Sequence, residues 1–287
     1  MTVDSPTVRL ELDSTPEALS LVRSALGGVA EQLALDPELL DDLKTAVSEA
    51  CNNVVMHAYK DETGPLEISL YTGADRIEVV VRDRGAGMPR EATVDDRLQG
   101  VGLPIIRALT HRASFRPIPG GGTEVEMIFV GAREGKPLFD APTTPSPDDG
   151  WTRRLDGDAV VSLSPISIVG GVLGRLARAL AARARFSLDR FSDVYLVTDA
   201  LAAYTARSAS GTRIGFGIAT GPKRLELSIG PFRAGTGAAL RDKQGPVGDV
   251  ASALLVLSDE LDVRPSGGGE MLHIVMIDSR SAGGGSS

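Results

Sequence analysis

Hydrophobic residues recur at three- and four-residue steps between about Asp41 and Tyr59, in the segment DDLKTAVSEACNNVVMHAY. This spacing predicts a helix with one buried face. The residues on that face are Leu39, Leu43, Ala46, Val47, Ala50 and Val54. Glu49, Asn53 and His57 follow one another at four-residue steps on a neighbouring face, so we expect their side chains to stack on successive turns. A carboxylate and a carboxamide placed in this way could hold a hydrated Mg²⁺ ion and supply a general base, and an ordinary half-exposed polar face is the alternative.

Six shorter patterns surround this helix. Alternating hydrophobic and polar residues predict strands, and capping residues followed by a proline predict the start of a second helix. In chain order these elements are the strand Thr7–Leu12, the helix Pro16–Leu33, and the strands Leu66–Tyr71, Arg76–Arg82, Ala113–Pro117 and Thr123–Val130. The pattern predicts an α/β fold with a mostly antiparallel sheet and helices on one face.

Glycines stand at three points where a ligand could approach the backbone. Gly85 and Gly87 follow Asp83, an acidic residue at the end of a predicted strand. Gly100 and Gly102 precede a short predicted helix, whose free N–H groups and dipole favour a phosphate. The third point is Gly120–Gly122, which on its own is typical of a plain turn. Each of these patterns is weak when taken singly, and their order along the chain carries the information.

That order is Glu-x-x-x-Asn, then Asp-x-Gly-x-Gly, then Gly-x-Gly-Leu, then Gly-Gly-Thr. It resembles the GHKL (Bergerat) ATP-binding fold over about residues 7–130. Within that superfamily, the string EACNNVVMHAY resembles the bacterial anti-sigma factor serine/threonine-protein kinases of the RsbW and SpoIIAB type.

The resemblance implies a set of site residues. Glu49 would orient or deprotonate the attacking hydroxyl, Asn53 would hold Mg²⁺, and Asp83 would bind the adenine amino group. The base of ATP would be contacted by Gly85, Gly87 and Thr123. Its phosphates would be contacted by Gly100 and Gly102. For His57, an anchor at the end of the helix and a catalytic group both remain open.

The resemblance also implies a function. We expect an ATP- and Mg²⁺-dependent serine/threonine-protein kinase that phosphorylates a STAS-domain anti-anti-sigma protein and can also sequester a sigma factor. The alternative is a nucleotide-gated protein-binding module with little or no kinase activity. The sequence has no Walker-type GxxxxGK[ST] motif, and no upstream helix carries a histidine typical of a histidine-kinase phospho-acceptor.

The second half of the chain repeats the order of elements of the first. Arg116-Pro117 recurs as Arg264-Pro265, 148 positions later, and the strand Ile77–Gly87 aligns with Leu225–Gly235. We therefore predict a tandem duplication, with chance similarity as the alternative. The predicted parts are an ATP-binding kinase domain at 1–133, a linker at 134–150 that is rich in proline and threonine, a degenerate copy at 151–280 and a glycine- and serine-rich tail at 281–287.

The second copy lacks most of the side chains that the first would use. At the predicted offsets Glu49 aligns with Asp199, Asn53 with Ala203, His57 with Arg207, Asp83 with Pro231, Gly85 with Arg233 and Gly102 with Val250. Alanine cannot ligate a metal, and proline offers no carboxylate. The second half is therefore predicted to be a pseudo-ATPase domain. The protein would be either a homodimer or an intramolecular pseudodimer, in which the second copy takes a partner's place.

Composition limits the partners and the location expected for the protein in three ways. The net charge of −8 is carried by the part of the chain up to Asp140, so a basic nucleic-acid-binding surface is not expected. No apolar run approaches the roughly 20 residues of a membrane span. The N-terminal sequence does not resemble a signal peptide, and Cys51 is the only cysteine, so we expect a cytoplasmic protein in which this thiol packs as a small hydrophobic group.

Overall fold

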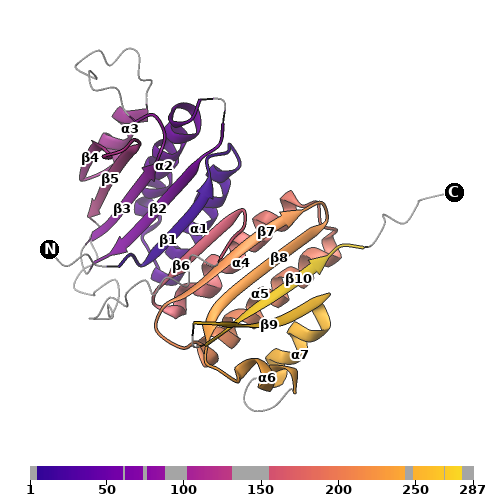
Figure 1. Ribbon diagram of the computed structural model, residues 1–287. Helices are drawn as coiled ribbons and strands as arrows, with labels where there is room; N and C mark the ends of the chain where they lie inside the picture. The colour runs from indigo at the N-terminus through magenta and orange to yellow at the C-terminus, as the bar shows by residue number, and fades with distance from the viewer. Residues whose placement is uncertain are drawn as a thin grey trace.

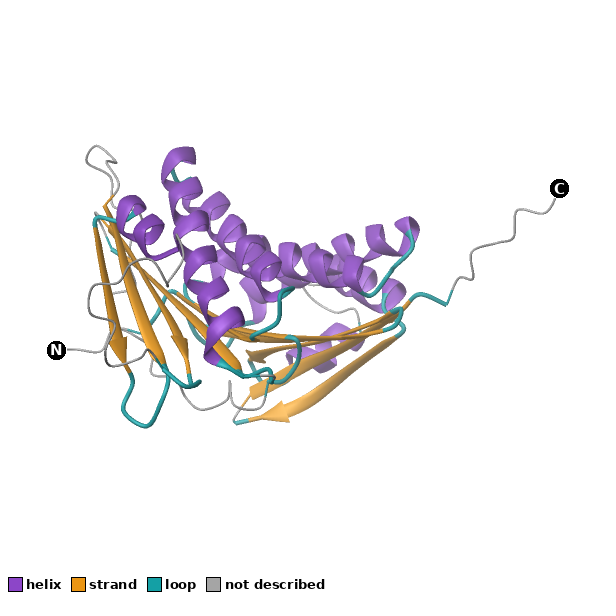
Figure 2. Ribbon diagram, turned by 90° about the horizontal axis from the view of Figure 1, so that it is seen from above, coloured by secondary structure: helices purple, strands orange, loops and turns teal. Residues whose placement is uncertain are grey.

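The computed structural model describes residues 5–60, 62–73, 76–87, 102–130, 155–242, 248–267 and 269–279. Ten strands form one continuous sheet, in the order β4-β5-β3-β2-β1-β6-β7-β8-β10-β9. Neighbouring strands are paired antiparallel along its whole width. The α-helices lie on one face of this sheet, which gives a two-layer α/β architecture (Figure 2).

The ten strands divide evenly between the two halves of the chain. The strands are β1 Val8–Asp13, β2 Pro65–Thr72, β3 Arg76–Asp83, β4 Arg112–Pro117, β5 Thr123–Val130, β6 Ala159–Leu163, β7 Ile214–Gly221, β8 Arg224–Phe232, β9 Glu260–Ser266 and β10 Gly269–Ile277. The helices are α1 Ala18–Leu33, α2 Pro37–Asn53, α3 Gly102–Leu109, α4 Val169–Arg183, α5 Leu188–Ser208, α6 Thr236–Arg241 and α7 Gly248–Leu257, with a π-helix η1 at Val54–Ala58 and a 3₁₀ turn η3 at Ile166–Ile168.

The central helix differs from its prediction at its C-terminal end. It begins at Pro37, because the Asp36 carboxylate accepts hydrogen bonds from the backbone N–H groups of Glu38 and Leu39. It ends as an α-helix at Asn53, where the π-helix η1 begins, so the expected α-helix to Tyr59 is wrong over its last turn. The predicted hydrophobic stripe is otherwise confirmed, with every member from Leu43 onward buried.

The two halves meet through β1 and β6. These strands pair antiparallel, with Val8 opposite Leu163, Leu10 opposite Val161 and Leu12 opposite Ala159. Figure 1 shows the sheet running without a break from β1 into β6. The predicted α/β fold class is confirmed, and the two expected sandwiches share one sheet and one hydrophobic core.

Helices α1 and α4 cross above this strand pair at a glycine contact. A Cβ atom on Gly28 would lie 2.4 Å from the carbonyl oxygen of Gly171, and a Cβ on Gly171 would lie 2.5 Å from that of Gly28. Only residues without a side chain allow the two backbones to approach so closely. At the edge of the crossing, Arg175 forms an ion pair with Glu31 at 3.0 Å.

Both halves have the same topology. Counted outward from the junction, the strand order is β1-β2-β3-β5-β4 in the first half and β6-β7-β8-β10-β9 in the second, and two helices follow the first strand of each. Arg116 of β4 pairs with Glu124, and Arg264 of β9 pairs with Met271. Descent of the two halves from one duplicated ancestor stays a prediction.

The domain boundaries also stay predictions. The predicted linker 134–150 and tail 281–287 lie outside the described residues. Within the described part of the chain, no helix combines the length and the apolar character that crossing a membrane would require.

The glycine contact predicts a contrast between two neighbouring positions of α1. Gly28→Ala should lower the free energy of unfolding by about 1–3 kcal/mol, because its Cβ would overlap the backbone of α4. Gly27→Ala is the matched control. Its Cβ would lie 3.6 Å from the flexible end of Arg175, so the better helix propensity of alanine should leave stability unchanged or higher by up to about 1 kcal/mol. Urea unfolding of both variants measures the difference, and equal midpoints would contradict this description of the crossing.

Candidate functional site

Glu49, Asn53 and Gly102 come together where α2 ends and α3 begins. Glu49 and Asn53 lie one turn apart on α2, and both side chains are half-buried. A Cβ atom on Gly102 would lie 3.1 Å from Glu49 Oε2 and 3.4 Å from Asn53 Oδ1, so the first residue of α3 is in contact with both side chains. The first turn of a helix has free N–H groups and the positive end of the helix dipole. A carboxylate, a carboxamide and a helix N-terminus therefore lie within a few ångströms of one another.

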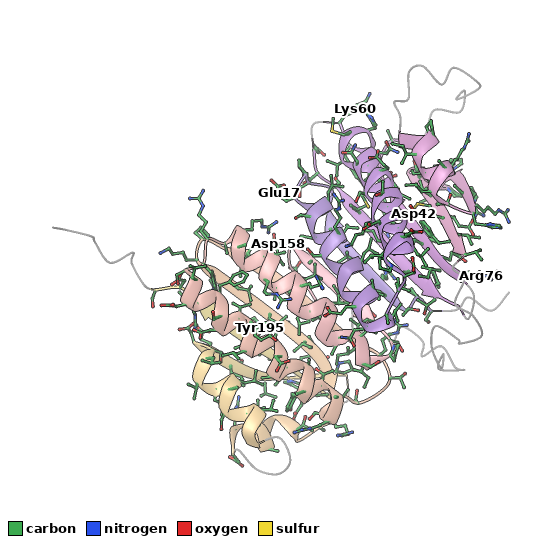
Figure 3. The ribbon with its side chains drawn as sticks, turned by 180° about the vertical axis from the view of Figure 1, so that it is seen from behind. Glu17, Asp42, Lys60, Arg76, Asp158 and Tyr195 are labelled. Carbon is green, nitrogen blue, oxygen red and sulfur yellow. The ribbon has the colours of Figure 1, made fainter. Side chains whose placement is uncertain are left out.

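His57 does not share this environment. It lies in the π-helix η1, and its side chain is exposed, whereas Glu49 and Asn53 are half-buried. The α-helical period on which the predicted stack of three side chains depended ends at Asn53. Short π-helical turns within helices often mark functional sites, and this one begins directly after Asn53. Asp42, near the start of α2, and Lys60, just after η1, lie towards opposite ends of this helical segment (Figure 3).

Asp83 is the buried acidic group at the end of β3, with 3% of its surface exposed. Its Oδ1 accepts a hydrogen bond from the Gly85 N–H at 2.8 Å, and its Oδ2 accepts one from the Thr123 N–H at 3.2 Å. Burial raises the pKa of the Asp83 carboxyl, and these hydrogen bonds oppose part of the rise. Each carboxylate oxygen has two lone pairs, so Asp83 can still accept a hydrogen bond from a ligand.

The glycines around Asp83 allow close backbone packing. A Cβ on Gly85 would lie 2.0 Å from the carbonyl oxygen of Ala58, at the end of η1. Gly87 has a φ of +76°, which is a left-handed conformation that glycine adopts readily. Gly122 has a φ of +100°, and a Cβ there would lie 2.1 Å from the Asp83 carbonyl oxygen. Taken alone, Gly120–Gly122 is typical of a plain turn, but it also supplies the Gly-Gly-Thr part of the predicted motif order, and the structure places Gly122 against Asp83.

The structure therefore places the predicted residues in two groups. One group comprises Glu49, Asn53 and Gly102, and the other comprises Asp83, Gly85, Gly87 and Thr123. Gly100 lies outside the described residues. Cys51 is fully buried, and burial raises the pKa of its thiol to about 12, which excludes it as a nucleophile near neutral pH.

The residues of these two groups fit an adenine nucleotide with a bound Mg²⁺ ion. The buried Asp83 carboxylate suits the exocyclic amino group of adenine, and the N-terminus of α3 suits phosphates. Among the described residues, no group of three or more histidine, cysteine or acidic side chains could hold a metal ion. Asn53 Oδ1 is an oxygen of the kind that Mg²⁺ accepts as a ligand beside phosphates.

The corresponding region of the second half has a different interior. A Cβ on Gly269 would lie 2.4 Å from the Phe232 carbonyl oxygen. In the first half, a Cβ on Gly122 would lie 2.1 Å from the Asp83 carbonyl oxygen. The structural counterpart of Asp83 is thus Phe232, one residue beyond the predicted Pro231. The Phe232 ring is fully buried and meets Tyr204 edge to face, with ring centroids 4.9 Å apart.

Glu270 occupies the position next to Gly269, as Thr123 follows Gly122. Its carboxylate accepts hydrogen bonds from the backbone N–H groups of Gly235 at 2.8 Å and Gly237 at 2.7 Å. The second half therefore satisfies these N–H donors with its own negative charge.

Residues 12–129 match the protein family described as the histidine kinase-like ATPase domain. The serine-protein kinase RsbW of Bacillus licheniformis is 34% identical over 96 residues, which cover 33% of this chain and 58% of that protein. The RsbW of Bacillus subtilis strain 168 is 40% identical over 79 residues, 27% of this chain and 49% of that protein. The chain thus spans about half the length of the curated relatives that it matches.

Solved structures agree less closely. The histidine kinase domain of a blue-light activated histidine kinase from Erythrobacter litoralis is 20% identical, with 32% of this chain and 44% of that chain covered. The TM-score between the two structures is 0.25. The family match and the sequence identities agree: residues 12–129 of this chain are similar to the histidine kinase-like ATPase domain family and to the RsbW serine-protein kinases.

Proposed function

We propose that the protein is an ATP- and Mg²⁺-dependent serine/threonine-protein kinase of the anti-sigma type. Its first half would phosphorylate a STAS-domain anti-anti-sigma protein, and the chain would also sequester a sigma factor. The observation that carries this proposal is the contact of Glu49 and Asn53 with Gly102 at the N-terminus of α3. We also propose a cytoplasmic location, which fits a single cysteine that is fully buried.

Each half of the site has a separate task in this proposal. Bound ATP would supply the γ-phosphoryl group, and its Mg²⁺ ion would offset charge that develops on the phosphates. Asp83 would accept a hydrogen bond from the adenine amino group, and the glycines beside it would admit the flat base. Asn53 would hold the metal through its carboxamide oxygen. Glu49 would orient the hydroxyl group of the protein substrate and accept its proton.

We further propose that the chain is a pseudodimer with one nucleotide site. The edge of β1 is covered by β6 along five residue pairs, so a second copy cannot add a strand there. In the second half Phe232 and Glu270 stand where the first half has Asp83 and Thr123. Ala203, which is predicted to align with Asn53, has no group that binds a metal.

Replacement of Glu49 by glutamine tests the role of the general base. Glu49→Gln should lower phosphoryl transfer to a STAS-domain protein by about a hundredfold or more, because the amide cannot accept the proton. The affinity for ATP should change little. The measurement is transfer of label from γ-labelled ATP to a panel of purified STAS-domain proteins. Asp41→Asn is the control, because Asp41 is an exposed acid on the same helix. An equally active Glu49→Gln protein would remove the mechanism and favour a nucleotide-gated binding module.

Replacement of Asp83 by asparagine tests the nucleotide pocket. Asp83→Asn should weaken ATP binding by about tenfold, because a charge-assisted hydrogen bond is replaced by a weaker one. Asp278→Asn is the matched control. Asp278 lies in the second half and is also a buried carboxylate, which accepts a hydrogen bond from the Ser187 backbone N–H at 2.6 Å. Calorimetric titration with ATP and Mg²⁺ measures both. Unchanged affinity in Asp83→Asn would show that the base binds elsewhere.

The pseudodimer proposal predicts one ATP per monomeric chain. Calorimetry on the full chain should give a stoichiometry of about one, and light scattering should give the mass of a single chain. Two sites per chain would contradict the role assigned to Phe232 and Glu270. A stable homodimer through the first half would contradict the role assigned to β6.

A further inference from the structure

Tyr59 connects the end of the central helix to the backbone beside Asp83. It follows η1 directly and has an extended backbone, with φ −120° and ψ 123°. Its hydroxyl group donates a hydrogen bond to the Pro65 carbonyl oxygen at 2.7 Å and accepts one from the Arg84 N–H at 2.8 Å. Pro65 is the first residue of β2, and Arg84 is the residue after Asp83. A single hydroxyl group thus bridges the start of one strand and the end of its neighbour.

The Tyr59 ring rests on a fixed support. A Cβ atom on Gly64 would lie 2.1 Å from Tyr59 Cε1, so the ring packs directly on the Gly64 backbone. Gly64 in turn exchanges two hydrogen bonds with Ser14: its carbonyl oxygen accepts from the Ser14 N–H at 2.8 Å, and its own N–H donates to Ser14 Oγ at 3.0 Å. The position of the hydroxyl group is therefore set by the end of β1 and the start of β2 as well as by the helix.

The phenol keeps its proton at neutral pH. Burial raises the pKa of Tyr59, and the negative charge of Asp83 raises it further, against the opposing effect of the Arg84 backbone. A protonated hydroxyl group can both donate to Pro65 and accept from Arg84, as the geometry requires.

The residue before Tyr59 holds the other side of the same segment. The Ala58 carbonyl oxygen accepts a hydrogen bond from the Ala86 N–H at 2.9 Å and contacts Gly85. Residues 84–86 are thus held at Arg84 by the Tyr59 hydroxyl group and at Ala86 by the Ala58 carbonyl group. The Gly85 N–H that lies between them donates to Asp83 Oδ1.

The second half lacks this hydroxyl group and uses a backbone carbonyl oxygen in its place. The N–H of Arg233, the residue after Phe232, donates to the Ser208 carbonyl oxygen at 2.9 Å, whereas the N–H of Arg84, the residue after Asp83, donates to the Tyr59 hydroxyl group. At the offset that aligns Asn53 with Ala203, Tyr59 aligns with Ala209. The half that has Phe232 instead of the aspartate thus also has no tyrosine at this position.

We propose that Tyr59 is a positioning residue for adenine recognition, acting through the Arg84 backbone to hold the Asp83 carboxylate at the angle the base requires. This inference rests on the proposed ATP site and adds a residue that determines its preference for adenine. It does not require Tyr59 to touch the nucleotide.

Tyr59→Phe tests the inference, because it removes the hydroxyl group and keeps the ring on Gly64. Both hydrogen bonds that the variant loses are exposed to solvent. Water can form hydrogen bonds to the freed groups, but it cannot hold them in the same positions. We expect the Kd for ATP with Mg²⁺ to rise about fivefold, while that for GTP changes little, so that the preference for ATP over GTP falls by a similar factor. Transfer at saturating ATP should remain within about twofold of wild type.

Tyr71→Phe is the matched control. Tyr71 is half-buried on β2 opposite Glu78, at the other end of the hairpin from Asp83, and its variant should keep the wild-type ratio of ATP to GTP affinity. A purely structural role for Tyr59 would lower the melting temperature without changing that ratio, and this result would overturn the inference. Failure of the wild-type protein to bind ATP would instead overturn the proposed function, and the inference with it.

Discussion

The antiparallel pairing of β1 with β6 is the contact on which the architecture depends. It joins ten strands into one sheet, and it places α1 against α4, where Gly28 and Gly171 let the helix backbones touch. An exposed edge strand is a template for pairing with another chain, and here the chain covers that edge with its own second half. The two halves consequently share a hydrophobic core and are held as one body.

The candidate site lies in the first half at the ends of elements, where backbone groups lack partners within a helix or strand. The end of α2 and η1 supplies Asn53, Ala58 and Tyr59, and the end of β3 supplies Asp83. Close packing through Gly85 and Gly102 brings these ends together. The precision of the site thus comes from backbone contacts at glycines more than from side-chain networks, which explains why so few charged groups are needed.

The second half shows what the same topology does without this chemistry. Phe232 and Tyr204 fill its interior with aromatic rings, and Glu270 satisfies N–H groups that a ligand would otherwise meet. Stability and ligand binding compete for the same space, because a buried carboxylate such as Asp83 carries a desolvation cost that a phenylalanine does not. One half of the protein retains that costly group and the other replaces it.

Sequence patterns alone predicted most of the secondary structure, because hydrophobic periodicity is a local property. The candidate site was predicted from the resemblance that the order of Glu49, Asn53, Asp83 and the glycines carries, and the roles of these residues stay proposals. The patterns did not show the change to a π-helix after Asn53, which depends on how the helix end packs on residues 84–86. Nor did they show that the two halves share a sheet, or that Phe232 and not Pro231 faces Gly269. Those features are contacts between residues far apart in the chain, and only the tertiary structure decides which backbones meet.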